Sequence, residues 1–152
     1  METLFNDLQN HLAASFGERV SLIDEDYGQL EALANGEDQY PVTFPCILVG
    51  LPQVDWRSIK PDIQQGTISL TVRLAFDCYD DTHYGSTQEH HVIGRMAMAR
   101  ELNSYIHGWS FGGSCSPMQR TNTVQSTYPG GIKAYSHTYM AKVEEYTGTS
   151  VK

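Results

Sequence analysis

The longest regular pattern of hydrophobic and polar residues lies in the middle of the chain and predicts a β-strand. From residue 68 to residue 79, apolar and polar side chains alternate, and only Ala75 places an apolar side chain on the polar side. A period of two puts the two sets on opposite faces of a strand, so one face is expected in the core. The predicted core face comprises Ile68, Leu70, Val72, Leu74, Phe76 and Cys78.

Two segments have the three-and-four spacing of amphipathic helices. The first covers residues 1–17 and is expected to end at Gly17; its apolar positions are Leu4, Phe5, Leu8, Leu12 and Phe16. The second follows a Ser-x-x-Glu capping box at residues 86–89 and is expected to end at Gly108. Its apolar stripe is Val92, Met96, Ala99, Leu102 and Ile106. We expect Val92, Met96, Ala99 and Ile106 to pack on the core face of the central strand.

Three more strands are predicted by local composition. Residues 44–50 form a short continuous apolar run between proline and glycine, which is typical of a strand buried on both faces. Residues 119–127 and 132–146 are expected to form a hairpin, because Tyr128-Pro129-Gly130-Gly131 fits a type II turn. Residues 18–42 are interpreted as mostly loop, with a short strand near residues 20–23 and a turn or short helix at 27–33 as options.

The order of elements predicts the fold class. Helix, loop, two strands, helix and two strands indicate an α+β domain with one largely antiparallel sheet and helices packed on one face. A chain of 152 residues is the size of one domain. The expected organisation is therefore a single domain over residues 1–152, with an N-terminal helix at 1–17, a loop-rich segment at 18–42 and a sheet-plus-helix core at 43–146.

Charge and composition exclude several classes of function. The formal net charge is −8, the wrong sign for the basic surface that sequence-neutral nucleic-acid binding requires. No apolar run approaches the roughly 18 residues of a membrane span, and the acidic start does not resemble a signal peptide. Three widely separated cysteines (Cys46, Cys78 and Cys115) suit free thiols in a reducing cytoplasm.

Candidate catalytic and metal-binding residues are sparse. His83, His90 and His91, near Cys78 and Glu89, form the best metal candidate, but adjacent histidines on a helix point about 100° apart and the ordinary ligand spacings are missing. Cys115 follows a Gly-Gly-Ser sequence that lacks the Gly-x-Ser-x-Gly pattern of a nucleophile turn. We expect no enzyme activity, no metal and no cofactor. A small hydrolase using Cys115 or the histidines, and a binding module with a cleft under residues 18–42, remain the alternatives.

Aromatic residues instead indicate contacts with other subunits. Tyr occurs nine times, and tryptophan and arginine are the residues that most often anchor interfaces. The predicted interface residues are Trp56, Arg57, Trp109 and Arg120, together with the loop at 77–90. Trp56 lies in a polar, proline-flanked segment with few apolar residues near it in the sequence. The alternative to a subunit contact is that Trp56 packs against its own domain. The central strand is longer than a typical strand, so we expect one end to project beyond the core as an arm.

Four stretches in this order resemble the tail-completion and tail-terminator proteins of long-tailed bacteriophages, especially those of Bacteroidetes prophages. The first is the strand that begins at Pro45, and the second is Gln53-Val54-Asp55-Trp56-Arg57. The third is Gln64-Gln65-Gly66 leading into Thr71-Val72-Arg73-Leu74. The fourth runs from Leu102 to Phe111, with Arg120-Thr121 after it. The long loop at 77–90 departs from the family.

The resemblance implies a structural protein without catalytic residues. Members form rings, often six-fold, at the end of the tail tube or between head and tail, where they stop tube growth and present a surface to the connector. It implies a homo-oligomeric ring that contacts the tube protein and neck proteins, assembles in the host cytoplasm and ends in the virion. An acidic lumen would let DNA pass without holding its phosphates.

Overall fold

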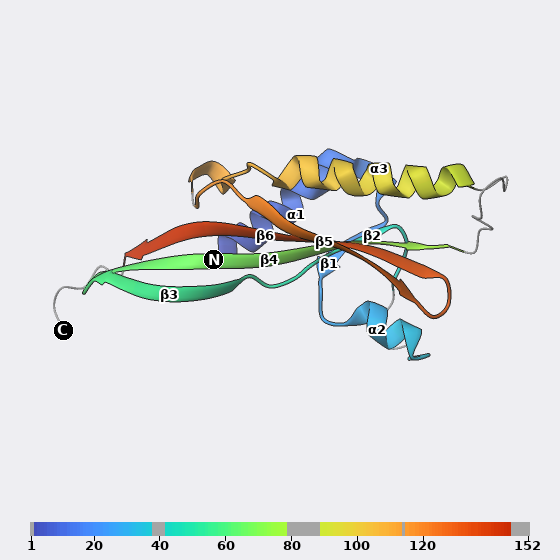
Figure 1. Ribbon diagram of the computed structural model, residues 1–152, viewed down its shortest axis with the longest axis horizontal. Helices are drawn as coiled ribbons and strands as arrows, with labels where there is room; N and C mark the ends of the chain where they lie inside the picture. The colour runs from blue at the N-terminus through green and yellow to red at the C-terminus, as the bar shows by residue number, and fades with distance from the viewer. Residues whose placement is uncertain (1, 38–41, 79–88, 114, 147–152) are drawn as a thin grey trace.

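A computed structural model describes residues 2–37, 42–78, 89–113 and 115–146 and contains one mixed six-stranded sheet (Figure 1). The strand order is β1-β2-β4-β6-β5, and β3 pairs with β4 beside β2. The β1–β2 pair is parallel and the other pairs are antiparallel, which confirms the predicted α+β class. The elements are α1 (Glu2–Phe16), η1 (Gly17–Arg19), β1 (Leu22–Glu25), α2 (Gln29–Ala34), β2 (Cys46–Val49), β3 (Gln53–Lys60), β4 (Ile63–Asp77), α3 (Glu89–Ile106), η2 (Phe111–Gly113), β5 (Gln119–Tyr128) and β6 (Ile132–Tyr146).

The centre of the sheet is the antiparallel pair β4–β6. Each strand has 15 residues, and they pair along their whole length, from Ile63 opposite Tyr146 to Asp77 opposite Ile132. At roughly 3.3 Å per residue this pair is about 50 Å long. The β5–β6 hairpin has the predicted bounds to within one residue, and Gly130 in its turn has φ of 92°, as a type II turn requires.

The main core lies between the sheet and helices α1 and α3, which cover the same face (Figure 1). We call this the helix-side face. The period-two prediction is confirmed, because the alternate residues from Ile68 to Phe76 are all buried in one cluster with Ala99, Leu102 and Ile106. The apolar side of α1 joins this cluster through Leu4, Leu8, Leu12 and Phe16.

The predicted buried stripe of α3 is wrong at Met96, and Val92 is only half-buried. Met96 is 49% exposed, whereas Arg95 is only 7% exposed and takes the sheet-facing place. Spacings of 92–96–99 and 92–95–99 both fit one face of a helix. The long apolar stem of an arginine can lie along an apolar surface, so Arg95 can occupy the buried position in spite of its charge. The capping box at 86–89 lies largely outside the described residues.

The segment at 18–42 is more regular than expected. It contains β1, which extends the sheet by parallel pairing with β2, and α2, which packs on the face opposite α1 and α3. We call this the α2-side face. Its small core comprises Leu30, Cys46, Leu48, Ala75, Ile132 and Ala134. All four residues of β2 are buried, as predicted, because this strand has a core on each face.

The segment containing Trp56 is a strand, β3, and not an irregular loop. It pairs with the first half of β4, which extends the central strand beyond its predicted start at residue 68. We define the arm as β3 together with residues 63–68 of β4 and residues 141–146 of β6. The arm tip extends past the ends of α1 and α3 in Figure 1, so the expected projection of the central strand is confirmed. Seven of the eight residues of β3 are exposed, so this strand has no buried apolar row of the kind that an alternating sequence pattern predicts.

Candidate assembly interface

Trp56 lies across the arm from Gly66, on the helix-side face. The two residues are direct partners in the β3–β4 pair. The next pair on the same face is Val54 opposite the buried Ile68. A Cβ atom added at Gly66 would lie 2.9 Å from Cε3 and Cζ3 of Trp56 and 2.5 Å from Cγ1 of Val54. The indole therefore covers the backbone of Gly66, and only glycine permits that approach. Trp56 is still 37% exposed, so part of its surface is available to a second molecule.

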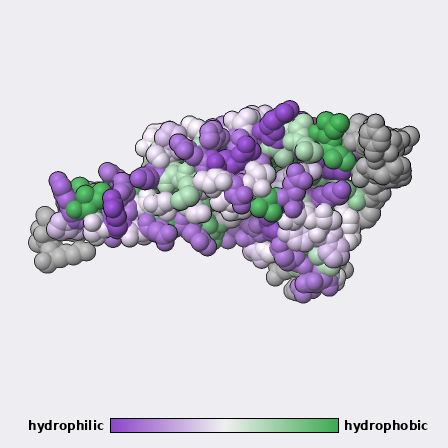
Figure 2. All heavy atoms as spheres, viewed as in Figure 1, coloured by the Kyte–Doolittle hydropathy of each residue, from purple (hydrophilic) through white to green (hydrophobic). Residues whose placement is uncertain are grey.

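Other apolar side chains surround Trp56 on the arm. Val143 lies opposite Gly66 on the far side of β4, and Val54 and Val143 are half-buried at the edge of the main core. Farther along the arm, Ile59 is 48% exposed and Tyr146 is 67% exposed. Figure 2 shows hydrophobic surface near the tip of the arm within mostly hydrophilic surroundings. The arm thus exposes several large apolar side chains, which single out this surface as a candidate contact.

Arg57 extends from the opposite face of the same strand. Its Nη2 donates a hydrogen bond to Oε1 of Gln65, its direct partner on β4, at 3.3 Å. The side chain is exposed, so this contact leaves most of the guanidinium in solvent. The structure therefore brings two predicted interface residues to one strand, on different faces.

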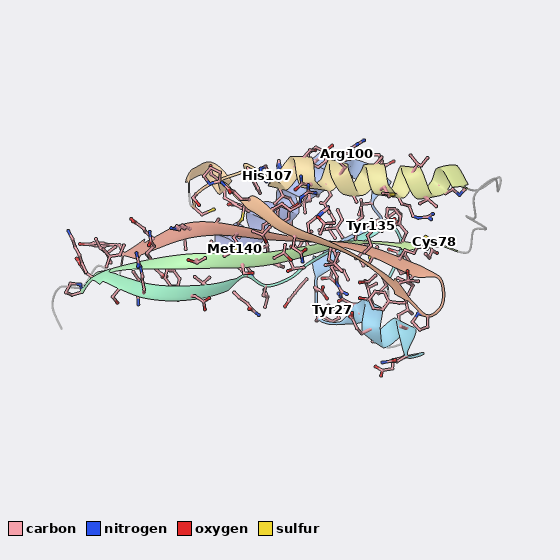
Figure 3. The ribbon with its side chains drawn as sticks, in the orientation of Figure 1. Tyr27, Cys78, Arg100, His107, Tyr135 and Met140 are labelled. Carbon is pink, nitrogen blue, oxygen red and sulfur yellow. The ribbon has the colours of Figure 1, made fainter. Side chains whose placement is uncertain are left out.

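Arg120 lies at the other edge of the sheet, near the start of β5. Its backbone N–H donates to Nδ1 of His107 at 3.1 Å, and His107 follows the C-terminal end of α3 (Figure 3). A register shift in the β5–β6 pair separates Arg120 from Asn122. The side chain of Arg120 is exposed, so the cation stays available to a partner.

Trp109 packs within its own domain. Its ring stacks on His11 of α1, with centroids 4.0 Å apart, and lies at the same distance from the ring of Phe111. Nε2 of His11 donates to the carbonyl of Tyr105 at 2.8 Å, which ties α1 to the last turn of α3. Trp109 is half-buried in this cluster, and its contact with a partner stays a prediction.

Cys115 has the environment of a structural thiol. It is buried, its Sγ donates to the carbonyl of Ser110 at 3.8 Å, and burial raises the pKa of the thiol above its ordinary value. A nucleophilic cysteine requires the opposite, a lowered pKa beside a base or cation. Cys46 and Cys78 are also buried and free, and burial raises the pKa of Cys46 to about 12.

The histidine candidates are only partly placed. His83 and the side chain of His90 lie outside the described residues, and His91 is half-buried on α3. Among the residues that the structure describes, no group of three His, Cys, Asp or Glu side chains could hold a metal ion. Within the same residues, no helix has the length and apolar character needed to cross a membrane.

The α2-side face carries a polar cluster centred on Arg73 of β4. This guanidinium binds the carboxylates of Asp26 and Glu31 and the hydroxyl of Tyr128, which in turn donates to Glu31 at 2.9 Å. Arg73 holds the pKa of Glu31 at about 2, well below its ordinary value of 4.5. An open depression of about 400 Å³ lies nearby, lined by Asp26, Gly50, Leu51, Gln53, Ser69 and Thr71. Because Asp26 is already paired with Arg73, the cluster serves to fasten α2 to the sheet.

Sequence reasoning missed several surface residues of the candidate interface. Ile59, Tyr146 and Val124 of β5 are exposed, but isolated apolar residues in polar segments give no periodic signal. The pairing of Gly66 with Trp56 also required the β3–β4 register, which the sequence pattern did not indicate.

No protein-family model and no curated protein matches the sequence. Among solved structures, the fold is similar to that of a chain in the virion of a native gene transfer agent (GTA) particle, with a TM-score of 0.55 and 11% sequence identity. The match covers 88% of this chain and 84% of that chain. The two proteins share a fold.

Proposed function

We propose that this chain is a structural subunit of a bacteriophage or phage-like particle, and that copies of it form a ring at the tail-tube end or the head–tail neck. The observation that carries the proposal is the similarity of fold over 88% of the chain to a chain of a gene transfer agent virion. The proposed activity is to complete or terminate tail assembly, without catalysis. The raised pKa of the Cys115 thiol supports this choice over a thiol-dependent hydrolase.

The shape of the molecule supports assembly into a closed ring. A cyclic assembly with head-to-tail contacts needs two different complementary surfaces on each subunit. The arm with Trp56 and Arg57 supplies one surface, and the β5 edge with Arg120 supplies a second, on the other side of the β4–β6 pair. The exposed tryptophan on the arm is the kind of side chain that dominates interface energies.

The charge of the chain suits a conduit for DNA. A net charge of −8 disfavours phosphate binding, so a ring of these subunits would let DNA pass through its lumen without retaining it. The proposed partners are further copies of this chain, the tail-tube protein and the neck or connector proteins. Assembly in the host cytoplasm and a final place in the virion tail or neck complete the proposal.

Light scattering and negative-stain microscopy test this function together. The purified chain, alone and mixed with tail tubes of the particle to which it belongs, is expected to form annular assemblies with a mass several times 17.0 kDa, either free or seated on tube ends. A chain that stays at 17.0 kDa at all concentrations and leaves tube ends bare would overturn the proposal.

A further inference from the structure

The strand β5 forms an open edge of the sheet. Within the described chain it pairs with β6 alone, and its residues from 119 to 125 are all exposed. Proteins block such edges with charged side chains, prolines, bulges or covering loops. The ten residues of β5 contain no proline and one charge, Arg120. The bulge and the hydrogen bond from Arg120 to His107 protect only the start of the strand.

The strand β3 forms a second open edge, which faces the other way. Among the described strands it pairs with β4 alone, along residues 63–69 of β4, whereas β5 pairs with residues 132–140 of β6, beside the other half of the β4–β6 pair. The free edges of β3 and β5 therefore point in opposite directions and are offset along the strands, so a neighbouring copy would be staggered by about the length of one edge strand. The two strands have similar lengths, eight and ten residues. A second copy that added its β3 to β5 of the first would continue the sheet and leave its own β5 free for a third copy.

We propose that β5 of one subunit pairs with β3 of the next, so that the sheet runs from subunit to subunit. The inference rests on the proposed ring function and names the strands that join its subunits. When this contact is repeated head to tail, the subunits close into a ring if a whole number of them completes a rotation of 360°. Main-chain hydrogen bonds supply the affinity in this mode of pairing, and the side chains that alternate along the strands supply the selectivity.

The distribution of charge favours a second copy along these edges. Two copies of an acidic chain repel each other unless their acidic groups stay apart. Together β3 and β5 contain three of the ten cationic residues and one of the eighteen acidic residues. The acidic residues near α2, such as Asp24 and Glu25 on β1, lie on a different edge of the sheet. Contact between β3 and β5 therefore keeps most of the negative charge away from the interface.

The faces of the two strands are also compatible. Trp56 lies on the helix-side face. On the same face β5 presents Arg120, Thr123 and Gln125. Their partners on β6, which are Tyr139, His137 and Tyr135, also lie on the helix-side face. A continued sheet places the exposed side of Trp56 next to uncharged side chains and one arginine. A guanidinium over an indole is favourable. On the α2-side face of the continued sheet, Asp55 and Arg57 of one copy lie next to the side chains of β5 of the other copy that include Val124.

Engineered disulfides test the pairing directly. Arg57 and Val124 are exposed and lie on the α2-side face, so we would replace them with cysteine singly and together, in the full chain. Asp55→Cys combined with Asn122→Cys or Ser126→Cys covers neighbouring registers. After mild oxidation, a double variant is expected to give a ladder in steps of 17.0 kDa on non-reducing gels. Each single variant and the unsubstituted chain, with its three buried cysteines, are expected to give no ladder.

A substitution at the edge provides a second measurement. Val124→Lys places a charge on the open strand and is expected to lower the assembled mass, whereas Val124→Thr keeps a branched, neutral side chain and is expected to assemble like the original chain. Dimers from Val124→Cys alone would show β5 pairing with itself and overturn the inference. Rings that form without any ladder, and with normal mass for Val124→Lys, would also overturn it while the proposed function stands. A chain that never assembles overturns the proposed function itself.

Discussion

Arg73 donates two hydrogen bonds to the carboxylate of Asp26, from Nε to Oδ2 at 2.6 Å and from Nη2 to Oδ1 at 2.7 Å. The arginine is in the middle of β4, and Asp26 directly follows β1. The same guanidinium binds both oxygens of Glu31 on α2, at 2.8 and 3.1 Å. One side chain thus fastens the strand and the short helix of residues 22–34 to the sheet.

Removing this guanidinium is expected to destabilise the domain. Arg73→Leu leaves the nearly buried carboxylate of Asp26 without its partner, and breaking one side of such a pair costs about 3 kcal/mol. Urea unfolding followed by circular dichroism measures the change. Arg57→Leu, an exposed arginine on the same sheet, serves as the control and is expected to change the free energy of unfolding by less than about 0.5 kcal/mol. Equal effects of the two substitutions would show that the Arg73 contacts do not hold the fold.

The same cluster predicts a pH dependence at acid pH. The pKa of Glu31 is about 2 in the folded chain and 4.5 ordinarily, so its contribution to stability is complete above pH 4.5 and is lost as the pH falls toward 2. Glu31→Gln is expected to lower stability at pH 6 and to reduce the fall in melting temperature between pH 4.5 and pH 2. An unchanged slope in the variant would show that Glu31 does not carry this dependence.

A second titration involves His137, which is buried between β6 and α3. Its Nε2–H donates to the carbonyl of Ala99 at 2.8 Å, and its Nδ1 accepts from the hydroxyl of Thr123 at 2.9 Å. Burial lowers the pKa of His137 below its ordinary 6.5, so stability is expected to fall as the pH drops below 6.5. His137→Gln should flatten the melting temperature between pH 7 and pH 5. If His137→Gln keeps the slope of the original chain, His137 is not its source.

The register of α3 against the sheet gives a prediction with an internal control. Leu74 is fully buried in the main core, so Leu74→Ala is expected to cost about 2–5 kcal/mol in the free energy of unfolding. Met96→Ala removes an exposed side chain and is expected to cost less than about 0.5 kcal/mol. Chemical denaturation of both variants measures the difference. A larger cost at Met96 would place the sheet-facing stripe of α3 one residue away from the one described.

How far the sequence predicted this fold depends on how each element gains its stability. The strand around Ile68–Phe76 and the helix containing Leu102 each bury one regular row of apolar side chains, and that periodicity is visible in the sequence. The strands β1 and β3 are held by pairing with β2 and β4 over few apolar residues, so their formation depends on partners distant along the chain. Local patterns do not contain that information.

The candidate interface was predictable to a smaller extent. Tryptophan and arginine in polar segments identified Trp56, Arg57 and Arg120 as exposed, but the same rule selected Trp109, whose ring packs on His11. Trp56 and Trp109 differ in their three-dimensional neighbours, which this rule does not take into account. The ion pairs of Arg73 with Asp26 and Glu31 could not be predicted either. In the sequence, Arg73 is simply one of the polar residues of an alternating strand.

The exchange of Trp56 to Ala and Arg57 to Glu, followed by light scattering, tests the central claim that the arm joins subunits. Both side chains are exposed and lie outside the buried core, so the double variant is expected to keep the circular dichroism spectrum and the cooperative thermal unfolding of the original chain. We predict that its mass falls toward 17.0 kDa under conditions in which the original chain forms rings. A folded double variant with the mass of the original assembly would contradict the account, as would a variant that unfolds, because Trp56 would then belong to the core.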